Sequence, residues 1–390
     1  MDLTENKVML KYKNILHISP TDIRYDSRIL KEIDALSKID DYKIKAFGIN
    51  DNEGHNYIPS KNYDIYAFSL FSKKINFIPR PLRYFFNLIE AILRLTIPLI
   101  RFNPRVIHCH DTLFLPLALI GKLICKSKII YDAHELESDK AGQTKMLSKY
   151  TLYIEKKVWK HIDLLISVSP SILDWYKNNI GEKGNLLIVN SPLLNKREIE
   201  KNNQNYFRDK YNIPEGDKIF LYLGIISREG RGIKLCLDVF KKHDINSHIV
   251  FMGYGDYSND IKKIALDYSN IHYHSAVPHD MVVNISKFAD VGLCLLEPVS
   301  LSDYYCLPNK LFEYAFSGLY ILASDFPDIK EIVQKYSLGE CTNLNLDDVY
   351  KSIKMIEKRI IENKNIDLYE LSWNYQAEKL IIGYKKILMK

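Results

Sequence analysis

The sequence lacks most of the features that assign a chain to a class at first sight. There is no CxxC pair, no low-complexity tract and, in residues 1–14, no continuous apolar run of the kind that directs secretion. We therefore expect a cytoplasmic protein whose six cysteines are mostly buried thiols of a reducing compartment. The net charge of +6 is too small to select nucleic acid, a phosphorylated ligand or an anionic membrane by itself.

Several catalytic motifs are absent as well. His134-Glu135 resembles the start of a zinc protease motif, but Ser138 stands where the second histidine is required. No DxD pair follows a strand, and Gly253-Tyr254-Gly255 lacks the third glycine of a dinucleotide-binding loop. His108 and His110 alternate along a predicted strand, so we expect their side chains to point to opposite faces and not to share a metal ion. The sequence therefore predicts no metal site and no cofactor.

What the sequence does contain is a repeated alternation of apolar, strand-like runs with helical stretches. The polar segment Asn195 to Asn205 divides this alternation and is the best linker candidate. A chain of 390 residues is also longer than one hydrophobic core usually supports. The predicted fold class is α/β, with two doubly wound parallel-sheet domains at 1–194 and 206–371 and a C-terminal helix at 372–390 that packs back on the first domain. The strand-like runs lie at 14–19, 42–47, 105–109, 128–131, 164–168, 186–189, 219–224, 248–253, 271–274 and 291–296.

Residues that directly follow the strands are the candidates for a ligand site, because open parallel sheets bind ligands beyond the carboxyl ends of their strands. In the second half, Arg231 is expected to aim its guanidinium at a phosphate, together with Lys310 and a helix that starts near Pro308. Glu313, one turn into that helix, is placed to accept hydrogen bonds from a ribose. The candidates in the first half are Asp22, Arg24, Asp26, Arg28, His110, Asp111 and Asp132.

The segment from Ser72 to Arg105 stands apart because it carries seven lysines or arginines, a single acid, Glu90, and a long apolar stretch. One interpretation is a buried helix lying on the sheet, since helices that are apolar nearly all round usually belong to a core. The other is an interfacial helix whose arginines contact anionic lipid headgroups. The apolar stretch is a poor transmembrane span, because it is short and contains a glutamate and an arginine.

Eight stretches of the chain, in the same order, resemble those of the bacterial retaining glycosyltransferases of family 4, which have the GT-B architecture of two facing Rossmann-like domains. They run from about Ile15 to Leu380 and read DSRILKE, VIHCHD, IIYDAHEL, SVSPSI, LYLGIISREGRG, MGYGD, LPNKLFEYAFSG and SWNYQAEKL. The resemblance implies transfer of a sugar from a nucleotide-diphosphate donor, with UDP or GDP as the nucleotide. It also implies net retention, and no metal or other cofactor.

The resemblance gives roles to individual residues. Glu313 is similar to the family glutamate that binds the donor ribose, and Arg231 stands where the family has a lysine on the donor phosphates. His134 matches a histidine that faces the donor sugar, so these three residues are the catalytic candidates. The implied donor-binding set is Gly224, Arg228, Arg231, Tyr305, Leu307, Pro308, Asn309, Lys310 and Glu313, and the residues of the first half named above form the acceptor side.

Two positions depart from the family pattern. Tyr305 replaces the first of two family glutamates, and Ile225 replaces an arginine that follows the strand-ending glycine. A tyrosine brings no negative charge to the reacting sugar, so the donor sugar is open. Arg228 or Lys310 is expected to substitute for the missing arginine.

The expected reaction is a hexosyl transfer on the front face of the donor, in which the departing phosphate helps to take the acceptor proton, because no second carboxylate is placed as a nucleophile. The expected acceptor is a saccharide, or a polyprenyl-linked saccharide of cell-surface polysaccharide synthesis, met at the inner face of the membrane by residues 72–105. The alternatives are a nucleotide-sugar 2-epimerase of the same architecture and a non-catalytic nucleotide-sugar-binding homologue. Nucleic-acid binding is the weakest alternative, because the basic residues lack interleaved aromatics.

Overall fold

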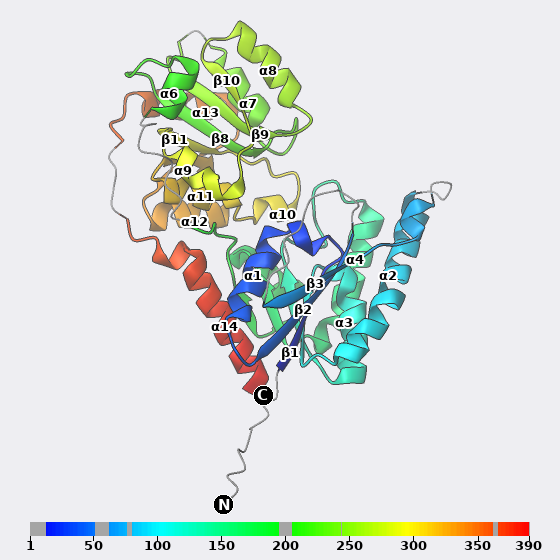
Figure 1. The fold of residues 1–390 in the computed structure, drawn as a ribbon. Helices are drawn as coiled ribbons and strands as arrows, with labels where there is room; N and C mark the ends of the chain where they lie inside the picture. The colour runs from blue at the N-terminus through cyan, green and yellow to red at the C-terminus, as the bar shows by residue number, and fades with distance from the viewer. Residues whose placement is uncertain are drawn as a thin grey trace, which may run out of the picture.

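The computed structural model describes residues 13–50, 62–75, 80–194, 205–242, 244–361 and 366–389. The chain forms two α/β domains, and a long C-terminal helix runs from the second domain back along the first (Figure 1). The prediction of two parallel-sheet domains is confirmed. The predicted linker Asn195 to Asn205 lies outside the described residues, except for Asn205, and so does most of residues 1–14.

The N-terminal domain is built on a seven-stranded parallel sheet in the order β3-β2-β1-β4-β5-β6-β7. The central strands are nearly continuous apolar runs because helices cover both faces of the sheet. Helix α1 packs on one face together with the C-terminal helix α14, and α2 to α5 pack on the other. The elements are β1 (Lys13–Ile18), α1 (Ser27–Ser37), β2 (Tyr42–Ile49), β3 (Tyr63–Phe68), α2 (Arg80–Phe102), β4 (Val106–His110), α3 (Leu115–Cys125), β5 (Lys128–Ala133), α4 (Lys145–Val158), β6 (Leu164–Ser167), α5 (Pro170–Asn179), β7 (Asn185–Leu187) and α14 (Trp373–Met389).

The C-terminal domain has a six-stranded parallel sheet in the order β10-β9-β8-β11-β12-β13. Helices α9, α11 and α12 pack on one face of this sheet, and α7, α8 and α13 pack on the other. The elements are α6 (Tyr206–Tyr211), β8 (Ile219–Ile225), α7 (Ile233–Phe240), β9 (His248–Tyr254), α8 (Ser258–Asp267), β10 (Ile271–Ser275), α9 (Val282–Ser286), β11 (Val291–Cys294), α10 (Leu301–Tyr304), α11 (Asn309–Ser317), β12 (Tyr320–Ser324), α12 (Pro327–Lys335), β13 (Gly339–Thr342) and α13 (Leu346–Glu357).

The strand order places one switch point in each sheet. In the N-terminal sheet the chain passes from β1 to β2 on one side and from the neighbouring β4 to β5 on the other. In the C-terminal sheet it passes from β8 to β9 on one side and from the neighbouring β11 to β12 on the other. Ligands of open α/β sheets bind beyond the carboxyl ends of such strands. The ends of β1 and β8 are therefore the places at which a site is expected.

Direct hydrogen bonds join the two domains. At the start of α5, the backbone N and Oγ of Ser171 donate to the Asp328 carboxylate of α12, at 3.1 and 2.8 Å. In α10, the Ser302 hydroxyl accepts from Leu136 N at 3.1 Å, and Ser302 N donates to Asp139 O at 3.1 Å. These contacts keep the carboxyl ends of the two sheets facing each other.

Helix α2 has two apolar faces, one buried as the first interpretation of residues 72–105 expects and one exposed. Ala91, Leu95 and Leu99 are buried in the core of the N-terminal domain, whereas Leu93 and Ile97 are 67% and 57% exposed. The helix is therefore anchored on the domain and also presents an apolar surface outwards. No helix in the described parts of the chain has the length and apolarity needed to span a bilayer.

Candidate functional site

A cavity of about 840 Å³ lies between the domains, where the carboxyl ends of the two sheets face each other. Both domains line it, as expected for a site at two facing switch points. The C-terminal wall includes Gly224, Arg231, Leu307, Pro308, Asn309, Lys310 and Glu313, and the N-terminal wall includes Asp26, Arg28, His134, Glu135, Lys140 and Asn190.

The N-terminus of α11 forms the centre of the C-terminal wall. Pro308 is the residue before the helix, with φ −75° and ψ 148°, and its fixed φ and missing N–H suit a position at a helix start. The first N–H groups of a helix have no intrahelical acceptor and carry partial positive charge. At the other end, Gly318 closes α11 with φ 75°, a conformation that favours glycine.

Lys310, in the first turn of α11, is the side chain that marks this wall as an anion site. Its ammonium group is buried without a hydrogen-bond partner among the described residues and lies 4.0 Å from the centre of the Tyr222 ring. Burial, together with the charge of Arg231, lowers the pKa of Lys310 to about 8. An ammonium held in this way is stabilised when an anion enters the cavity.

Glu313 follows one turn later on the same helix and is also buried, at 7% exposure. Burial raises the pKa of its carboxyl group to about 7, although the charges of Lys310 and Lys31 act in the opposite direction. His279 Nδ1 lies 3.6 Å from Glu313 Oε1. The carboxylate therefore has acceptor capacity that a ligand with hydroxyl groups can use.

Arg231 is held at the cavity by a rigid loop. Gly230 N donates to Glu297 Oε2 at 2.5 Å, and Gly232 has φ 65°. A Cβ atom at Gly232 would lie 2.3 Å from Leu295 O, so only glycine fits there. No carboxylate of the described residues forms an ion pair with Arg231, which leaves its guanidinium available to a ligand.

On the opposite wall, His134 follows β5 and is 17% exposed through its side chain. Its Nε2 lies 3.2 Å from Asp132 Oδ2 and 3.0 Å from His110 Nδ1. Asp132 also accepts from Arg28, whose Nη2 is 3.0 Å from Oδ1. His134 therefore stands at the cavity surface in front of a buried ion pair.

The expectation that His108 and His110 point to opposite faces is wrong. Their rings are stacked, with centroids 4.3 Å apart, because residues two positions apart on a strand share a face. His17 joins them from β1, and its Nδ1 lies 3.0 Å from His110 Nε2. Two groups therefore have nitrogen and carboxylate atoms close enough to meet one metal ion: His17, Glu32, His108 and His110, and His110, Asp132 and His134.

Several predicted site residues do not line the cavity. Arg228 pairs with Asp260, at 2.8 Å, and lies over the ring of Tyr257. Tyr305 packs against the hydrophobic core of the N-terminal domain, because its ring finds an apolar contact there that a carboxylate would lack. Asp22 and Arg24 form an ion pair with each other, at 2.5 Å.

The remaining predicted residues of the N-terminal wall support their neighbours. Asp26 caps α1, since its Oδ1 accepts from Arg28 N and Ile29 N at 3.0 and 3.1 Å. Asp111 has φ 66° and ψ 156°, a strained conformation for any residue but glycine, and lies 3.9 Å from Lys140 Nζ. His110 and Asp132 lie behind His134 and are fully buried.

Three of the polar residues that line the cavity were not predicted from the sequence. Lys140 and Asn190 lie in irregular segments of the N-terminal domain, and His279 lies in a short helical turn after β10. Lys140 is paired with Glu137, at 2.8 Å, and lies 3.7 Å from Glu135. Such contacts depend on how the loops fold over the sheet and leave no local pattern in the sequence.

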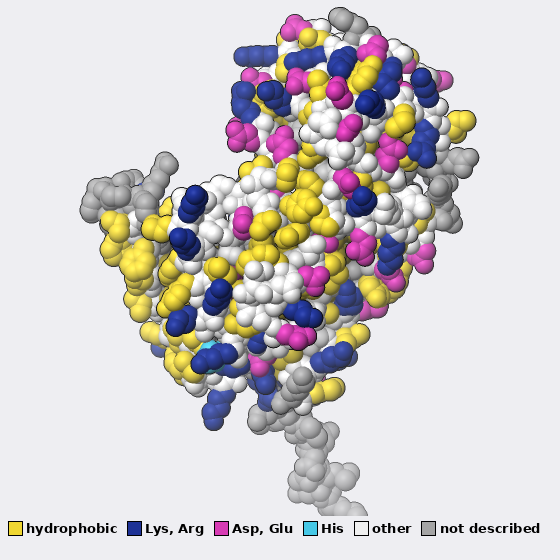
Figure 2. Space-filling model, turned by 180° about the vertical axis from the view of Figure 1, so that it is seen from behind, with side chains coloured by type: hydrophobic (Ala, Val, Ile, Leu, Met, Phe, Trp, Pro, Cys, Tyr) yellow, Lys and Arg dark blue, Asp and Glu magenta, His cyan; other side chains and the backbone are white. Residues whose placement is uncertain are grey.

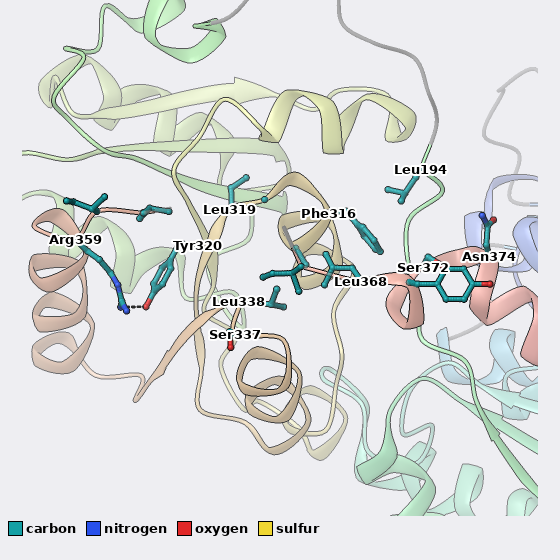
Figure 3. Close-up of a pocket in the computed structure, with 16 residues that line it drawn as sticks. Leu194, Phe316, Leu319, Tyr320, Ser337, Leu338, Arg359, Leu368, Ser372 and Asn374 are labelled. Atoms are coloured by element: carbon teal, nitrogen blue, oxygen red, sulfur yellow. Dashed lines mark hydrogen bonds between the residues drawn. The ribbon is translucent and has the colours of Figure 1, made fainter. Parts of the chain in front are cut away.

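A second cavity, of about 680 Å³, lies at the opposite end of α11, where the C-terminal domain meets the segments that contain Leu194 and Asn374 (Figure 3). Phe316, Leu319 and Leu338 line it, and the nearby Arg359 donates to the hydroxyl of Tyr320. A helix C-terminus carries partial negative charge, and the arginine is already used. This cavity therefore has none of the anion-binding groups of the first.

Residues 59–189 match the family described as Glycosyltransferase Family 4, and residues 203–379 match the family described as Glycosyl transferases group 1. The two matches and the two facing parallel-sheet domains define a glycosyltransferase of GT-B architecture. The chain belongs to glycosyltransferase family 4. No curated protein matches it.

Solved structures share the fold over almost the whole chain. Sucrose-phosphate synthase from Thermosynechococcus elongatus is 15% identical, with a TM-score of 0.76, over 97% of this chain and 99% of that one. Anabaena HepE in complex with UDP-glucose is 11% identical, with a TM-score of 0.65, over 96% of both chains. The lipopolysaccharide outer core galactosyltransferase WaaB is 13% identical, with a TM-score of 0.64, over 95% of this chain and 99% of that one. At these identities the likeness establishes the fold.

Proposed function

We propose that the protein is a retaining, metal-independent hexosyltransferase that moves a sugar from a nucleotide-diphosphate donor to a saccharide acceptor. The observation that carries the proposal is the unpaired, buried ammonium of Lys310 at the start of α11, beside Arg231. Two cations and the N–H groups of a helix start converge on one point of the cavity, which suits a diphosphate. Glu313, one turn further, is assigned to the donor ribose.

The chemistry that these residues offer is electrostatic. As the glycosidic bond breaks, negative charge grows on the departing nucleotide diphosphate. Lys310, Arg231 and the α11 N–H groups stabilise that charge without rearranging. The departing phosphate then takes the proton of the acceptor hydroxyl on the face of the sugar that it leaves, which preserves the anomeric configuration. His134 on the facing wall positions the donor sugar, and contact between the domains limits the entry of water.

UDP is the nucleotide that we expect first, with GDP as the alternative. HepE, which shares the fold, is described in complex with UDP and with UDP-glucose. Nothing in the C-terminal wall requires a metal to hold the diphosphate, because Lys310 and Arg231 supply positive charge directly. The proposed enzyme therefore needs its donor and its acceptor but no resident cofactor.

We further propose a lipid-linked saccharide acceptor, met at the inner face of the cell membrane by helix α2. Five apolar side chains form an outward stripe along the helix, and the apolar end of α3 lies beside it. In Figure 2, hydrophobic side chains gather along the left edge of the molecule over α2, with Lys and Arg side chains nearby. The stripe consists of Leu82, Phe86, Ile89, Leu93 and Ile97, and Leu123 and Ile124 extend it.

Charge favours an anionic lipid surface over a second copy of the chain as the occupant of this face. Residues 80–128 contain eight lysines or arginines and only two acids, Glu90 and Asp111. Glu90 is already used, since it accepts from Phe71 N and Ser72 N at 2.8 Å and pairs with Arg94 at 3.0 Å. Two such basic faces repel each other, whereas an apolar and basic helix face suits a membrane interface.

The transfer proposal is tested by incubating the protein with UDP- and GDP-sugars, with and without a lipid extract that supplies polyprenyl-linked saccharides. We expect release of the nucleoside diphosphate that depends on the lipid extract, persists with EDTA and is lost in Arg231→Ala. Formation of a 2-epimer without acceptor would instead indicate an epimerase. Binding of the donor without turnover under any condition would indicate a non-catalytic homologue.

The membrane proposal is tested separately, with vesicles of phosphatidylcholine alone and vesicles that also contain phosphatidylglycerol. We expect the protein to sediment with the anionic vesicles, and Leu93→Glu to abolish this. Leu266→Glu is the matched control, because Leu266 is 86% exposed on α8 of the other domain. Equal sedimentation of the two variants would contradict the proposal, and dimerisation lost in Leu93→Glu would assign the face to a second copy.

A further inference from the structure

Three side chains in the core of the N-terminal domain bring unpartnered polar atoms to one place. These atoms are His17 Nε2, His108 Nε2 and both carboxylate oxygens of Glu32, and none has a hydrogen-bond partner among the described residues. All three residues are 0% exposed. Buried polar atoms without a partner are costly and rare in native proteins. The three side chains therefore indicate a ligand that the described chain does not itself supply.

Two adjacent strands and one helix bring these side chains together. His17 of β1 and His108 of β4 are direct neighbours in the sheet, and their ring centroids lie 4.7 Å apart. Glu32 belongs to α1, which packs on the same face of the sheet. Its Oε2 lies 3.6 Å from His108 Nε2, too far for a hydrogen bond. The carboxylate and the imidazole are therefore close to each other without being hydrogen-bonded.

The nearby Arg28 does not satisfy Glu32. Arg28 Nε lies 3.2 Å from Glu32 Oε1, but it donates its hydrogen to Asp132 Oδ2, at 3.3 Å. Arg28 Nη2 also donates to Asp132, at 3.0 Å from Oδ1, and Nη1 donates to Ile188 O at 2.9 Å. The guanidinium therefore attracts Glu32 by charge while its hydrogen bonds go to other acceptors. One guanidinium serves two carboxylates here, and buried charges are otherwise stabilised by a metal ion.

The second ring nitrogen of each histidine is already held. His17 Nδ1 lies 3.0 Å from His110 Nε2, and His108 Nδ1 lies 2.7 Å from the hydroxyl of Tyr384 on α14. Histidines that bind a metal usually donate their other ring N–H in a hydrogen bond that fixes the ring. Both rings have this second contact, and each keeps Nε2 for an ion.

The distances in this cluster are those of a metal site. One nitrogen or carboxylate oxygen from each of His17, Glu32, His108 and His110 lies within 4.8 Å of the others. A tetrahedral ion with bonds of about 2.0–2.2 Å separates its ligand atoms by about 3.3–3.6 Å, and Glu32 Oε2 and His108 Nε2 are 3.6 Å apart. Both nitrogens of His110 already have partners, since its Nδ1 lies 3.0 Å from His134 Nε2. His110 is therefore assigned to holding the ring of His17.

We propose that His17 Nε2, His108 Nε2 and the carboxylate of Glu32 bind one divalent transition-metal ion in the core of the N-terminal domain. Two imidazole nitrogens and one carboxylate form a ligand set that suits zinc. Water or the second oxygen of Glu32 completes the coordination of an ion that has three protein ligands. The ion gives a partner to both imidazoles and to the carboxylate, which the described chain leaves without one.

The proposed ion is structural. It joins α1 to β1 and β4, and none of its three ligands is among the described residues that line the cavity between the domains. It therefore stands apart from the donor diphosphate, and this inference does not depend on the proposed transfer. The prediction of no metal site assumed that His108 and His110 point to opposite faces, and that assumption is wrong.

The test is elemental analysis of the full-length protein, expressed in zinc-supplemented medium without a histidine tag and dialysed against EDTA to remove exposed ions. We expect about one equivalent of zinc per chain in the wild type, and at least about tenfold less in Glu32→Gln. His272→Gln is the matched control, because His272 Nε2 lies 2.9 Å from His248 Nδ1 in the other domain. This control keeps the zinc content of the wild type.

X-ray absorption at the zinc edge of the wild type identifies the ligands even if Glu32→Gln does not fold. We expect imidazole nitrogen and carboxylate oxygen at about 2.0–2.2 Å, and no sulfur at about 2.3 Å. Less than about a tenth of an equivalent of zinc in the wild type would overturn the inference, because a protonated Glu32 or a buried water then satisfies these atoms. Sulfur ligands, or equal zinc in Glu32→Gln and the wild type, would also overturn it and indicate an adventitious ion only. None of these measurements needs turnover, so failure of the metal site and failure of the proposed transfer are distinguished.

Discussion

Replacing Lys310 by methionine separates the stability of the free protein from its affinity for a diphosphate. The pKa of the ammonium falls from 10.5 to about 8 on folding, chiefly because of burial. A difference of this size corresponds to a folding cost of about 3 kcal/mol, offset by a cation–π contact with Tyr222 of about 1–2 kcal/mol. Methionine removes the charge and keeps an unbranched chain. Free Lys310→Met is therefore expected to be as stable as the wild type at pH 7, or more stable.

The pH dependence has a defined sign. Between pH 8 and 10.5 the unfolded chain binds the proton of Lys310 more tightly than the folded protein does. The stability contributed by this group therefore rises with pH across that window, and the rise is absent in Lys310→Met. The affinity of Lys310→Met for nucleotides is expected to fall, although its stability stays the same or rises. Loss of a charge-assisted hydrogen bond to phosphate, worth about 1.5–3 kcal/mol, weakens nucleoside diphosphate binding about 10- to 150-fold.

Two assays check these statements. Urea unfolding of both proteins from pH 7 to 10.5 gives the stabilities, and titration calorimetry with UDP and GDP gives the affinities. Lys234→Met is the matched control, because Lys234 is exposed on α7 and is expected to change neither quantity. The reasoning is refuted if free Lys310→Met loses 2 kcal/mol or more at pH 7 and still binds the nucleotide as the wild type does.

Three further predictions concern other parts of the molecule. In the wild type, stability falls as pH rises from 4.5 to about 7, because the folded protein holds the Glu313 proton more tightly than the unfolded chain does; Glu313→Gln is expected to remove this fall. Urea midpoints of Glu313→Gln that follow those of the wild type across this pH range would contradict the prediction. Gly292→Ala places a Cβ atom 2.3 Å from Cγ of Tyr314, so we expect the free energy of unfolding to fall by at least about 2 kcal/mol. An unaltered urea midpoint at pH 7 would contradict this expectation. Leu93→Glu is expected to abolish vesicle binding and to leave the melting temperature within about 1–2 °C of the wild-type value, because Leu93 is exposed. A large drop in melting temperature would mean that Leu93 is packed against the rest of the protein.

Much of the fold follows from the sequence because buried parallel strands are short, continuous apolar runs. Strands β3 and β13 and helix α4 are among the elements that were not predicted. β3 lies at the edge of its sheet and exposes Asp64 and Tyr66, so it lacks the continuous apolar character of the others. In α4 the apolar positions are mixed with lysines and tyrosines, many of which are exposed, so its helical periodicity is weak.

The two walls of the site differ in how far the sequence predicts them. Arg231, Lys310 and Glu313 were predictable because Arg231 lies in the loop after β8, and Lys310 and Glu313 lie in the first turns of α11. Tyr305 was not, because its surroundings belong to the core of the other domain. The prediction for His108 and His110 is wrong because only adjacent residues of a strand point to opposite faces. Residues two positions apart share a face.

The central claim, that the wall formed by α11 and Arg231 binds a nucleoside diphosphate, is tested most directly by thermal unfolding with UDP, GDP, ADP and CMP. A ligand that binds only the folded protein, at 100 times its Kd, adds about 2.7 kcal/mol to stability. We expect UDP or GDP to raise the melting temperature of the wild type, and the same nucleotide to have no effect on a variant that combines Lys310→Met and Arg231→Ala. No rise with any of these nucleotides, or an equal rise in the double variant, would contradict the claim.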